Sequence, residues 1–189
     1  MDFKRNPLLL LSIGLFVGIV VAEVVYCFYA PTILPDGSIE VVTNRDYYPE
    51  VSQLLRGAQE SIHIIMFSAN YQTGPDYADA HVNELVQELV AARNRGVDVQ
   101  VIMDSWPEGN EKSLQYLLKN NVVAKKVQDV GTTHAKLIII DGKLVVVGST
   151  NWSHYSVDLN NEANVVVNNE RIAQEFEGYF TGLSSLKAS

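Results

Sequence analysis

Apolar and polar positions repeat with two different periods along the chain. Between Asp79 and Arg95 the apolar residues recur at helical spacing, and Gly96 ends the run. The segments 61–67 (SIHIIMF) and 97–103 are rich in β-branched residues, and the second alternates apolar with polar positions. These patterns predict a long amphipathic helix between two strands.

Weaker signals of the same kinds complete the pattern. Strands are predicted at 39–43, 122–127 and 165–167, and helices at 49–58, 111–119 and 170–183. Two more strands flank Asp141-Gly142, a dipeptide typical of hairpin turns. Strands that alternate with helices indicate an α/β fold with a mixed β-sheet flanked by helices.

The N-terminal segment is apolar throughout. Residues 8–30 contain a single charged residue, Glu23, and about 20 apolar residues suffice for a helix to cross a bilayer. We expect a transmembrane helix, or alternatively a signal peptide cleaved near Ala22. Lys4 and Arg5 precede the segment, which favours an N-terminus inside and a body outside the cytoplasm. Residues 1–30 are therefore predicted to be a membrane anchor or signal peptide, 31–38 a linker and 39–189 the folded domain, either membrane-attached or secreted or periplasmic after cleavage.

Composition limits the partners of the domain. The formal net charge is −8, which repels polyanions overall, so contact with nucleic acid or anionic lipid needs a local patch. Candidates for a basic patch are Lys125, Lys126, Lys143, Arg93 and Arg95. The single cysteine, Cys27, excludes an intrachain disulfide.

The predicted hairpin carries polar residues that a buried hairpin does not need. His134 and Lys136 are two residues apart and project from the same face of a strand. After the turn, the returning strand brings Ser149 and Asn151 back beside them. An imidazole, an ammonium, a hydroxyl and an amide suit a phosphodiester, with a nucleophile and donors for the phosphoryl oxygens.

The full array, His134-x-Lys136-x4-Asp141-x6-Gly148-Ser149-x-Asn151, resembles the HKD motif of the phospholipase D superfamily. Its single copy is similar to the small one-motif members, the bacterial endonuclease and mitochondrial cardiolipin hydrolase (Zucchini) groups. The zinc-binding cysteines and histidine of the Zucchini group have no counterpart here. The likeness extends over 39–180.

The resemblance implies a reaction without a metal or other cofactor. His134 would be a nucleophile that forms a phosphohistidine, and Lys136, Ser149 and Asn151 would hold the phosphoryl oxygens. Asp141 would be mainly structural, and Glu162 would orient the His134 ring. His154 follows the motif and could line the groove.

The single motif also predicts an assembly. Two-step phosphoryl transfer needs a second, protonated imidazole for the leaving oxygen, and this chain supplies one motif. A homodimer with His134 from both subunits at the two-fold axis meets this need. Three functions stay open: a nuclease, a phospholipase acting on membrane phospholipids, and a non-catalytic phosphate-binding module.

Overall fold

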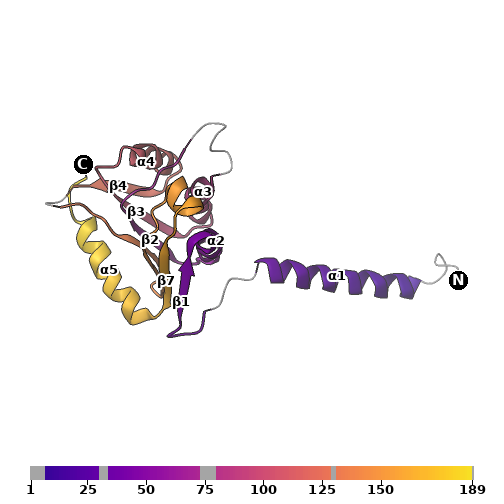
Figure 1. The fold of residues 1–189 in the computed structure, drawn as a ribbon. Coiled ribbons are helices and arrows are strands. Elements are labelled where there is room, and N and C mark those ends of the chain that lie inside the picture. Colours follow the sequence, from indigo (N-terminus) through magenta and orange to yellow (C-terminus); the bar gives the residue numbers. More distant parts are fainter. Residues whose placement is uncertain (1–6, 30–33, 73–79, 129–130, 189) are drawn as a thin grey trace. The chain divides into compact units, whose positions relative to one another are not determined.

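The computed structural model describes residues 7–29, 34–72, 80–128 and 131–188 (Figure 1). The chain divides into two compact units, Met1–Thr32 and Ile33–Ser189. The described residues of the first unit form the helix α1 (Pro7–Tyr29). Across the described ranges, no helix has both the length and the apolar character that a bilayer crossing needs. The predicted transmembrane anchor, and the membrane-attached location built on it, are therefore corrected.

The second unit is built on one mixed sheet. Its strands are β1 (Ile39–Thr43), β2 (Ser61–Met66), β3 (Asp98–Asp104), β4 (Val123–Val127), β5 (Lys136–Ile140), β6 (Leu144–Gly148) and β7 (Ala163–Asn168). They lie in the order β1-β7-β6-β5-β2-β3-β4. β2, β3 and β4 run parallel, and the other neighbours pair antiparallel. The predicted α/β class with a mixed sheet is confirmed.

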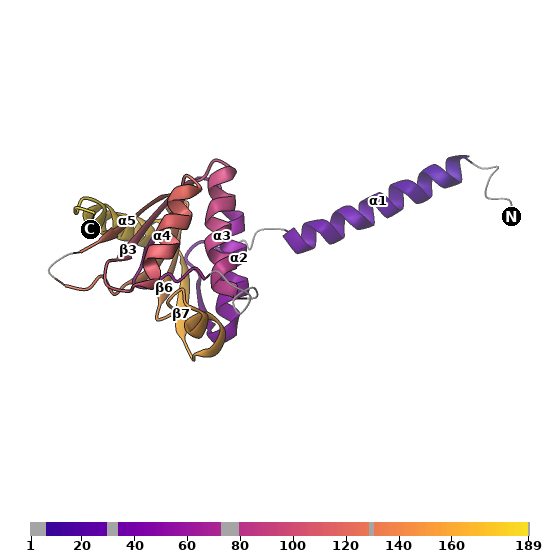
Figure 2. The same cartoon turned by 90° about the horizontal axis from the view of Figure 1, so that it is seen from above.

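Helices cover both faces of this sheet. α2 (Tyr47–Gly57), α3 (His81–Asn94) and α4 (Gly109–Lys119) lie on one face, and α5 (Glu170–Ser184) lies on the other (Figures 1 and 2). The strand residues alternate between these layers: in β5, Ile138 and Ile140 join the core under the three helices, while Leu137 and Ile139 join the core under α5. The described residues of this unit also include the 3₁₀ helix η2 (Asn44–Asp46) and the π-helix η4 (Tyr155–Leu159).

The β5–β6 hairpin determines where the motif lies. Asp141 and Gly142 form its turn with φ of 53° and 59°, the left-handed values that a type I′ turn requires. The opposite end of the hairpin meets the carboxyl end of β2, because Lys136 pairs with Met66. This edge of the sheet collects the start of β5 and the ends of β2 and β6.

Candidate active site

Lys136 is the buried cation of this edge. Lys136 is only 7% exposed, and its Nζ donates a hydrogen bond to the backbone oxygen of His134 at 2.7 Å. The same Nζ lies 3.1 and 3.2 Å from the two ring nitrogens of His134, and 5.0 Å from the centre of the Phe67 ring. Burial lowers the pKa of Lys136, and the charge of Glu162 offsets part of that fall. The ammonium is therefore held at a fixed place beside the imidazole.

His134 lies on the extended segment that precedes β5, and its side chain is exposed. Phe67, which continues β2, donates its backbone N–H to Ala135 at 3.0 Å and so ties that segment to the sheet. The Phe67 and His134 rings are 4.5 Å apart at 50°. The imidazole thus rests on an aromatic side chain while its outer side is open to a substrate.

Ser149 and Glu162 form a pair next to this site. The Ser149 hydroxyl donates to the Glu162 carboxylate and accepts the Ala163 N–H at 3.1 Å. Asn160 donates to the other oxygen of Glu162 at 3.1 Å. In the described part of this chain the carboxylate makes no hydrogen bond to the His134 ring. The expected orienting contact from Glu162 to His134 is therefore not seen within one chain, and the charge of Glu162 raises the pKa of Lys136 against the larger lowering by burial.

Asn151 reaches the site because the chain crosses from β6 to the end of β2. Trp152 donates its N–H to Ser68 at 2.9 Å and accepts from Asn70 at 2.7 Å. β5 lies between β6 and β2, so this crossing passes the start of β5. Asn151 Oδ1 is buried and has no hydrogen-bond partner among the described residues. Four motif residues, His134, Lys136, Ser149 and Asn151, therefore gather at one edge of the sheet.

Asp141 lies at the other end of the hairpin. Its carboxylate accepts the backbone N–H groups of Gln59, Glu60 and Ser61 at 3.0, 2.7 and 2.9 Å. These three residues lead from α2 into β2. This arrangement ties the hairpin turn to the entry of the central strand, and it keeps Asp141 away from His134.

A buried polar network that the sequence analysis missed supports the site from the β3 side. Asp104 is 4% exposed and accepts the N–H of Thr133, the residue before His134, at 2.7 Å. Asn110 is fully buried and its side chain donates to the backbone oxygens of Phe67 and Asp104, both at 2.8 Å. It also accepts the Ala69 N–H at 2.7 Å. The network fixes the two segments that carry the imidazole and its aromatic support.

A second missed group holds the β6 side. Asn164 is 4% exposed, and its amide donates to the hydroxyl of the fully buried Thr150 at 2.8 Å. Gly148 lies so close to Asn164 and Ala163 that a Cβ there would overlap both. A glycine is therefore required at this position of the motif for close packing of β6 against β7.

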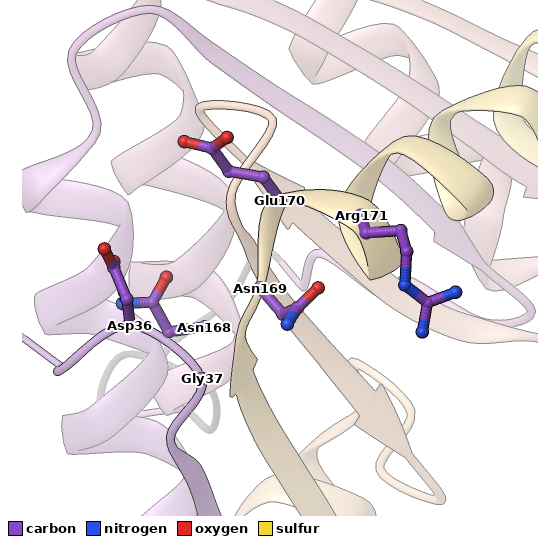
Figure 3. Close-up of a pocket in the computed structure, with 6 residues that line it drawn as sticks. All are labelled: Asp36, Gly37, Asn168, Asn169, Glu170 and Arg171. Carbon is purple, nitrogen blue, oxygen red and sulfur yellow. The ribbon is translucent and has the colours of Figure 1, made fainter.

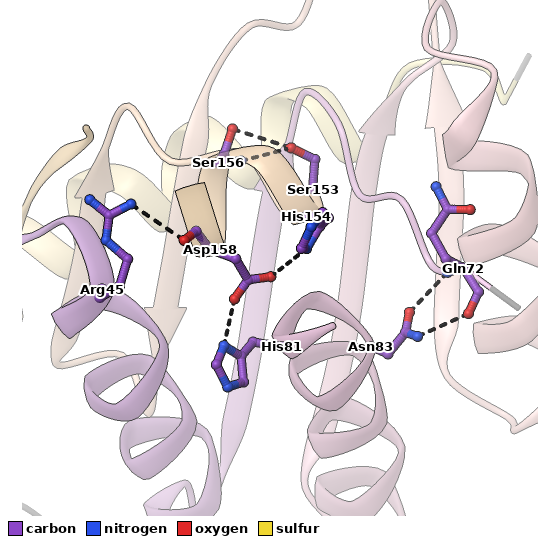
Figure 4. Close-up of polar contacts among 8 residues, drawn as sticks. All are labelled: Arg45, Gln72, His81, Asn83, Ser153, His154, Ser156 and Asp158. Atoms are coloured by element: carbon purple, nitrogen blue, oxygen red, sulfur yellow. Dashed lines mark hydrogen bonds and ion pairs between the residues drawn. The ribbon is translucent and has the colours of Figure 1, made fainter. Parts of the chain in front are cut away.

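His154 belongs to a separate cluster (Figure 4). Its Nδ1 lies 2.8 Å from Asp158, and Nδ1 of His81 lies 2.5 Å from the other oxygen of that carboxylate. Arg45 donates to the Asp158 backbone oxygen at 3.4 Å. The cluster ties η4 to α3 and η2. Within the described ranges, no group of three or more histidine, cysteine or acidic residues is arranged to hold a metal ion.

The five candidate basic residues do not converge on the site. Lys126 pairs with Glu111 at 2.6 Å, and Lys143 lies 3.7 Å from Asp36. The other three donate to backbone oxygens: Lys125 to Ser184 and Leu186, Arg93 to Asn121, and Arg95 to Leu55. The contacts are spread over different elements, so these side chains form no single patch.

A pocket at the start of α5 is also separate from the motif. It is lined by Asp36, Gly37, Asn168, Asn169, Glu170 and Arg171 (Figure 3). Asn168 pairs with Leu144, whereas the motif glycine Gly148 pairs with Asn164 at the other end of β6. The pocket and the motif therefore lie at opposite ends of the same strands.

Comparison with known proteins identifies the family. The family model described as cardiolipin synthase, PLD-like domain, matches residues 51–184. The chain belongs to the phospholipase D-like family. This confirms the resemblance drawn from the motif.

Two curated relatives and one solved structure illustrate the likeness. The mitochondrial cardiolipin hydrolase of Canis lupus familiaris is 28% identical over 130 residues, which cover 67% of this chain and 47% of the relative. Cardiolipin synthase A of Proteus mirabilis is 30% identical over 129 residues, 62% of this chain and 25% of the relative. The chain thus spans about half the length of the first of these relatives. Nuc from Salmonella typhimurium, a phospholipase D family member, has the same fold, with a TM-score of 0.70, 22% identity, and coverage of 82% of this chain and 99% of that chain.

Proposed function

We propose that this phospholipase D-like chain is a phosphodiesterase that works through a covalent phosphohistidine at His134 in a homodimer. The observation that carries the proposal is the exposed imidazole of His134 beside the buried ammonium of Lys136. A nucleophile next to a fixed cation is the pairing that phosphoryl transfer needs, because charge develops on the phosphoryl oxygens as the bond to the leaving group breaks.

The reaction then takes two steps. A ring nitrogen of His134 attacks phosphorus, the bond from phosphorus to the leaving oxygen breaks, and an imidazolium gives that oxygen its proton. In the second step water attacks the phosphohistidine, the P–N bond breaks, and the same second imidazole takes a proton from the water. Lys136, Ser149 and Asn151 hold the non-bridging oxygens throughout.

The second imidazole is the reason for proposing a homodimer. Within the described residues, the other histidines are engaged elsewhere: His81 and His154 contact Asp158, and His63 contacts Glu177 at 2.7 Å. A two-fold axis at the motif edge brings His134 of the partner subunit to face the nucleophile. The edge is suited to such a contact because the His134 side chain is exposed there.

Nucleic acid is the substrate we propose. Its support is the aromatic side chains around the imidazole: Phe67 contacts the His134 ring, and the Trp106 ring centre lies 6.2 Å from that of Phe67. Aromatic side chains next to a phosphate site suit a strand whose bases stack.

Membrane phospholipid is the alternative substrate. Tyr155 and Leu159, on the π-helix that follows Asn151 in the sequence, are 69% and 56% exposed, and exposed apolar side chains suit lipid chains. The curated relatives include proteins named cardiolipin hydrolase and cardiolipin synthase. Turnover of phospholipid vesicles without cleavage of single-stranded DNA or RNA would favour this alternative.

Mixed dimers test the proposal. The His134→Ala homodimer should not hydrolyse bis(4-nitrophenyl) phosphate, and a His154→Ala control should keep its activity because that ring contacts Asp158 and not the motif. A heterodimer of wild-type and His134→Ala subunits should be nearly inactive on a diester with a poor leaving group. Half of the wild-type activity would show that each subunit works alone. Binding of diesters without turnover by the wild type would instead indicate a non-catalytic phosphate-binding module.

A further inference from the structure

Trp106 is a large apolar side chain left in solvent beside the motif edge. It is 79% exposed, and it lies in the turn between β3 and α4. Its ring and the Phe67 ring are 6.2 Å apart and inclined by only 25°. No step of the proposed phosphoryl transfer uses this indole.

The turn that carries Trp106 is fastened at several points. Ser105 donates its N–H to Val127 at 3.1 Å, and Trp106 donates its own N–H to the Asp104 carboxylate at 2.8 Å. The backbone oxygen of Asp104 in turn accepts from the buried Asn110 side chain at 2.8 Å. The indole is therefore mounted on a backbone that is already ordered, so less conformational entropy is lost when a ligand contacts it.

Trp106 also lies within reach of a substrate held at His134. Phe67 is the link between them: its ring centre lies 6.2 Å from the indole and 4.5 Å from the imidazole, so the indole and imidazole are separated by less than the two distances combined. A nucleotide next to the bond being cleaved can span this separation. Its phosphate would lie at Lys136 while its base extends over the aromatic side chains.

We infer that Trp106 forms a stacking subsite for a nucleobase next to the scissile phosphate of a single-stranded nucleic acid. The inference rests on the proposed phosphodiesterase function and specifies its substrate class. Stacking suits this chain because a base contributes affinity through its π-face and needs no basic surface for that. The chain has a net charge of −8, and its candidate lysines and arginines are scattered.

The surroundings of Trp106 favour a base over a membrane surface. Helices and loops that enter a bilayer interface do so with several apolar side chains. In the turn 105–108, Trp106 is flanked by Ser105 and Pro107, and Glu108 is exposed. A single indole without another exposed apolar side chain in its turn suits one stacked ring better than insertion into a bilayer interface.

The test removes the base and the indole separately. Dinucleoside monophosphates contain one diester, so the substrates are the intact compound and two analogues, each with one base replaced by hydrogen. With the wild-type full chain, loss of the stacked base should lower kcat/KM by about 5- to 150-fold. Trp106→Ala should lower kcat/KM on the intact compound by a similar factor, and it should no longer distinguish that compound from the abasic analogue. Trp106→Phe should keep most of the wild-type kcat/KM on the intact compound and most of its preference over the abasic analogue.

Controls separate the ways in which the inference can fail. Tyr179→Ala removes another exposed aromatic side chain, 48% exposed on α5, and should leave all rates unchanged. An equal loss by Trp106→Ala on intact and abasic substrates, or no loss, would overturn the subsite. A lower rate on phospholipid vesicles with unchanged dinucleotide cleavage would identify the indole as a lipid contact and also overturn it. A wild type that hydrolyses bis(4-nitrophenyl) phosphate but no nucleotide would reject the base subsite while the phosphodiesterase proposal stands.

Discussion

Replacing Lys136 by methionine should separate activity from stability. Methionine keeps a long apolar stem in the buried position but removes the ammonium, which is the proposed holder of the phosphoryl oxygens. Loss of one such donor typically lowers kcat about 10²- to 10³-fold. We therefore expect Lys136→Met to be nearly inactive on diesters while its fold is retained.

The effect on stability follows from the contacts of the ammonium. Lys136 is 7% exposed, and no carboxylate within the described residues forms an ion pair with it. Losing its 2.7 Å hydrogen bond to the His134 oxygen costs about 1.5 to 3 kcal/mol at most, and water can replace that donor because His134 is exposed. Replacing a buried ion pair by apolar groups of similar volume is neutral or gains about 1 to 4 kcal/mol in other proteins, because the cost of desolvating the charges is removed, and the same saving applies to the Lys136 ammonium. The free energy of unfolding at pH 7 should therefore stay unchanged or rise by up to about 2 kcal/mol.

Urea titrations followed by circular dichroism, at one protein concentration, measure the difference in free energy of unfolding between the wild type and Lys136→Met. The dependence of that difference on pH gives an internal check. Because burial lowers the pKa of Lys136 below its ordinary value of 10.5, the unfolded chain binds its proton more readily between the lowered pKa and 10.5. As pH rises through that window, the free energy of unfolding of the wild type should therefore rise relative to that of Lys136→Met. The difference in stability that favours the variant should become smaller. Lys136→Ala should lose about 2 kcal/mol or more because it leaves a cavity. A Met variant less stable than the wild type by more than about 1 kcal/mol would refute the reasoning.

Three further outcomes are expected. Asp141→Ala should lower the free energy of unfolding, measured in urea, by about 1 to 3 kcal/mol, because three backbone N–H groups lose a charged acceptor. Its kcat/KM on a small diester should not change. A stable but inactive variant would contradict the structural role of Asp141. Gly148→Ala should lower both activity and stability, by roughly 2 kcal/mol, because its Cβ would overlap Asn164. Gly178→Ala, in open space on α5, is its control and should stabilise by about 0.5 to 1 kcal/mol. Excess EDTA should leave diester hydrolysis unchanged, and a loss reversed by added metal would indicate metal catalysis.

The sheet and the hairpin could be predicted from the sequence because their signals are local. The Asp141-Gly142 turn marks the hairpin, and short apolar runs mark both of its strands, so the pairing of β5 with β6 could be predicted; the observed register of Leu137 with Val147 leaves three residues, 141–143, in the loop. The same local logic placed Lys136 and Ser149 at one end of the hairpin. The turn dipeptide and the apolar runs beside it were therefore enough to predict most of the proposed site.

The missing parts of the site depend on contacts between distant segments. Asp104 reads as an ordinary acidic residue at the end of a strand, because its partner Thr133 lies 29 positions further on. Asn110 reads as a surface residue at a helix start, although it is fully buried and joins two segments. Glu162 was expected to orient His134; within this chain it bonds Ser149, and sequence distance from the motif does not determine which side chain a residue faces.

An acidic protein can still hold an anionic substrate when its cation is buried. The field of surface charges is screened within about 8 Å at physiological salt, so the net charge of −8 affects the approach of a polyanion more than its contacts at the site. In the proposed site, Lys136 would act at contact distance and in a medium of lower dielectric constant, where the same charge interacts more strongly. Its partners are a backbone oxygen and aromatic rings, so the ammonium is not neutralised by a carboxylate at contact distance. If the proposed function holds, affinity has to come from the groups next to the reacting phosphate, and a buried lysine with the proposed stacking ring beside it suits this acidic chain better than a wide basic surface would.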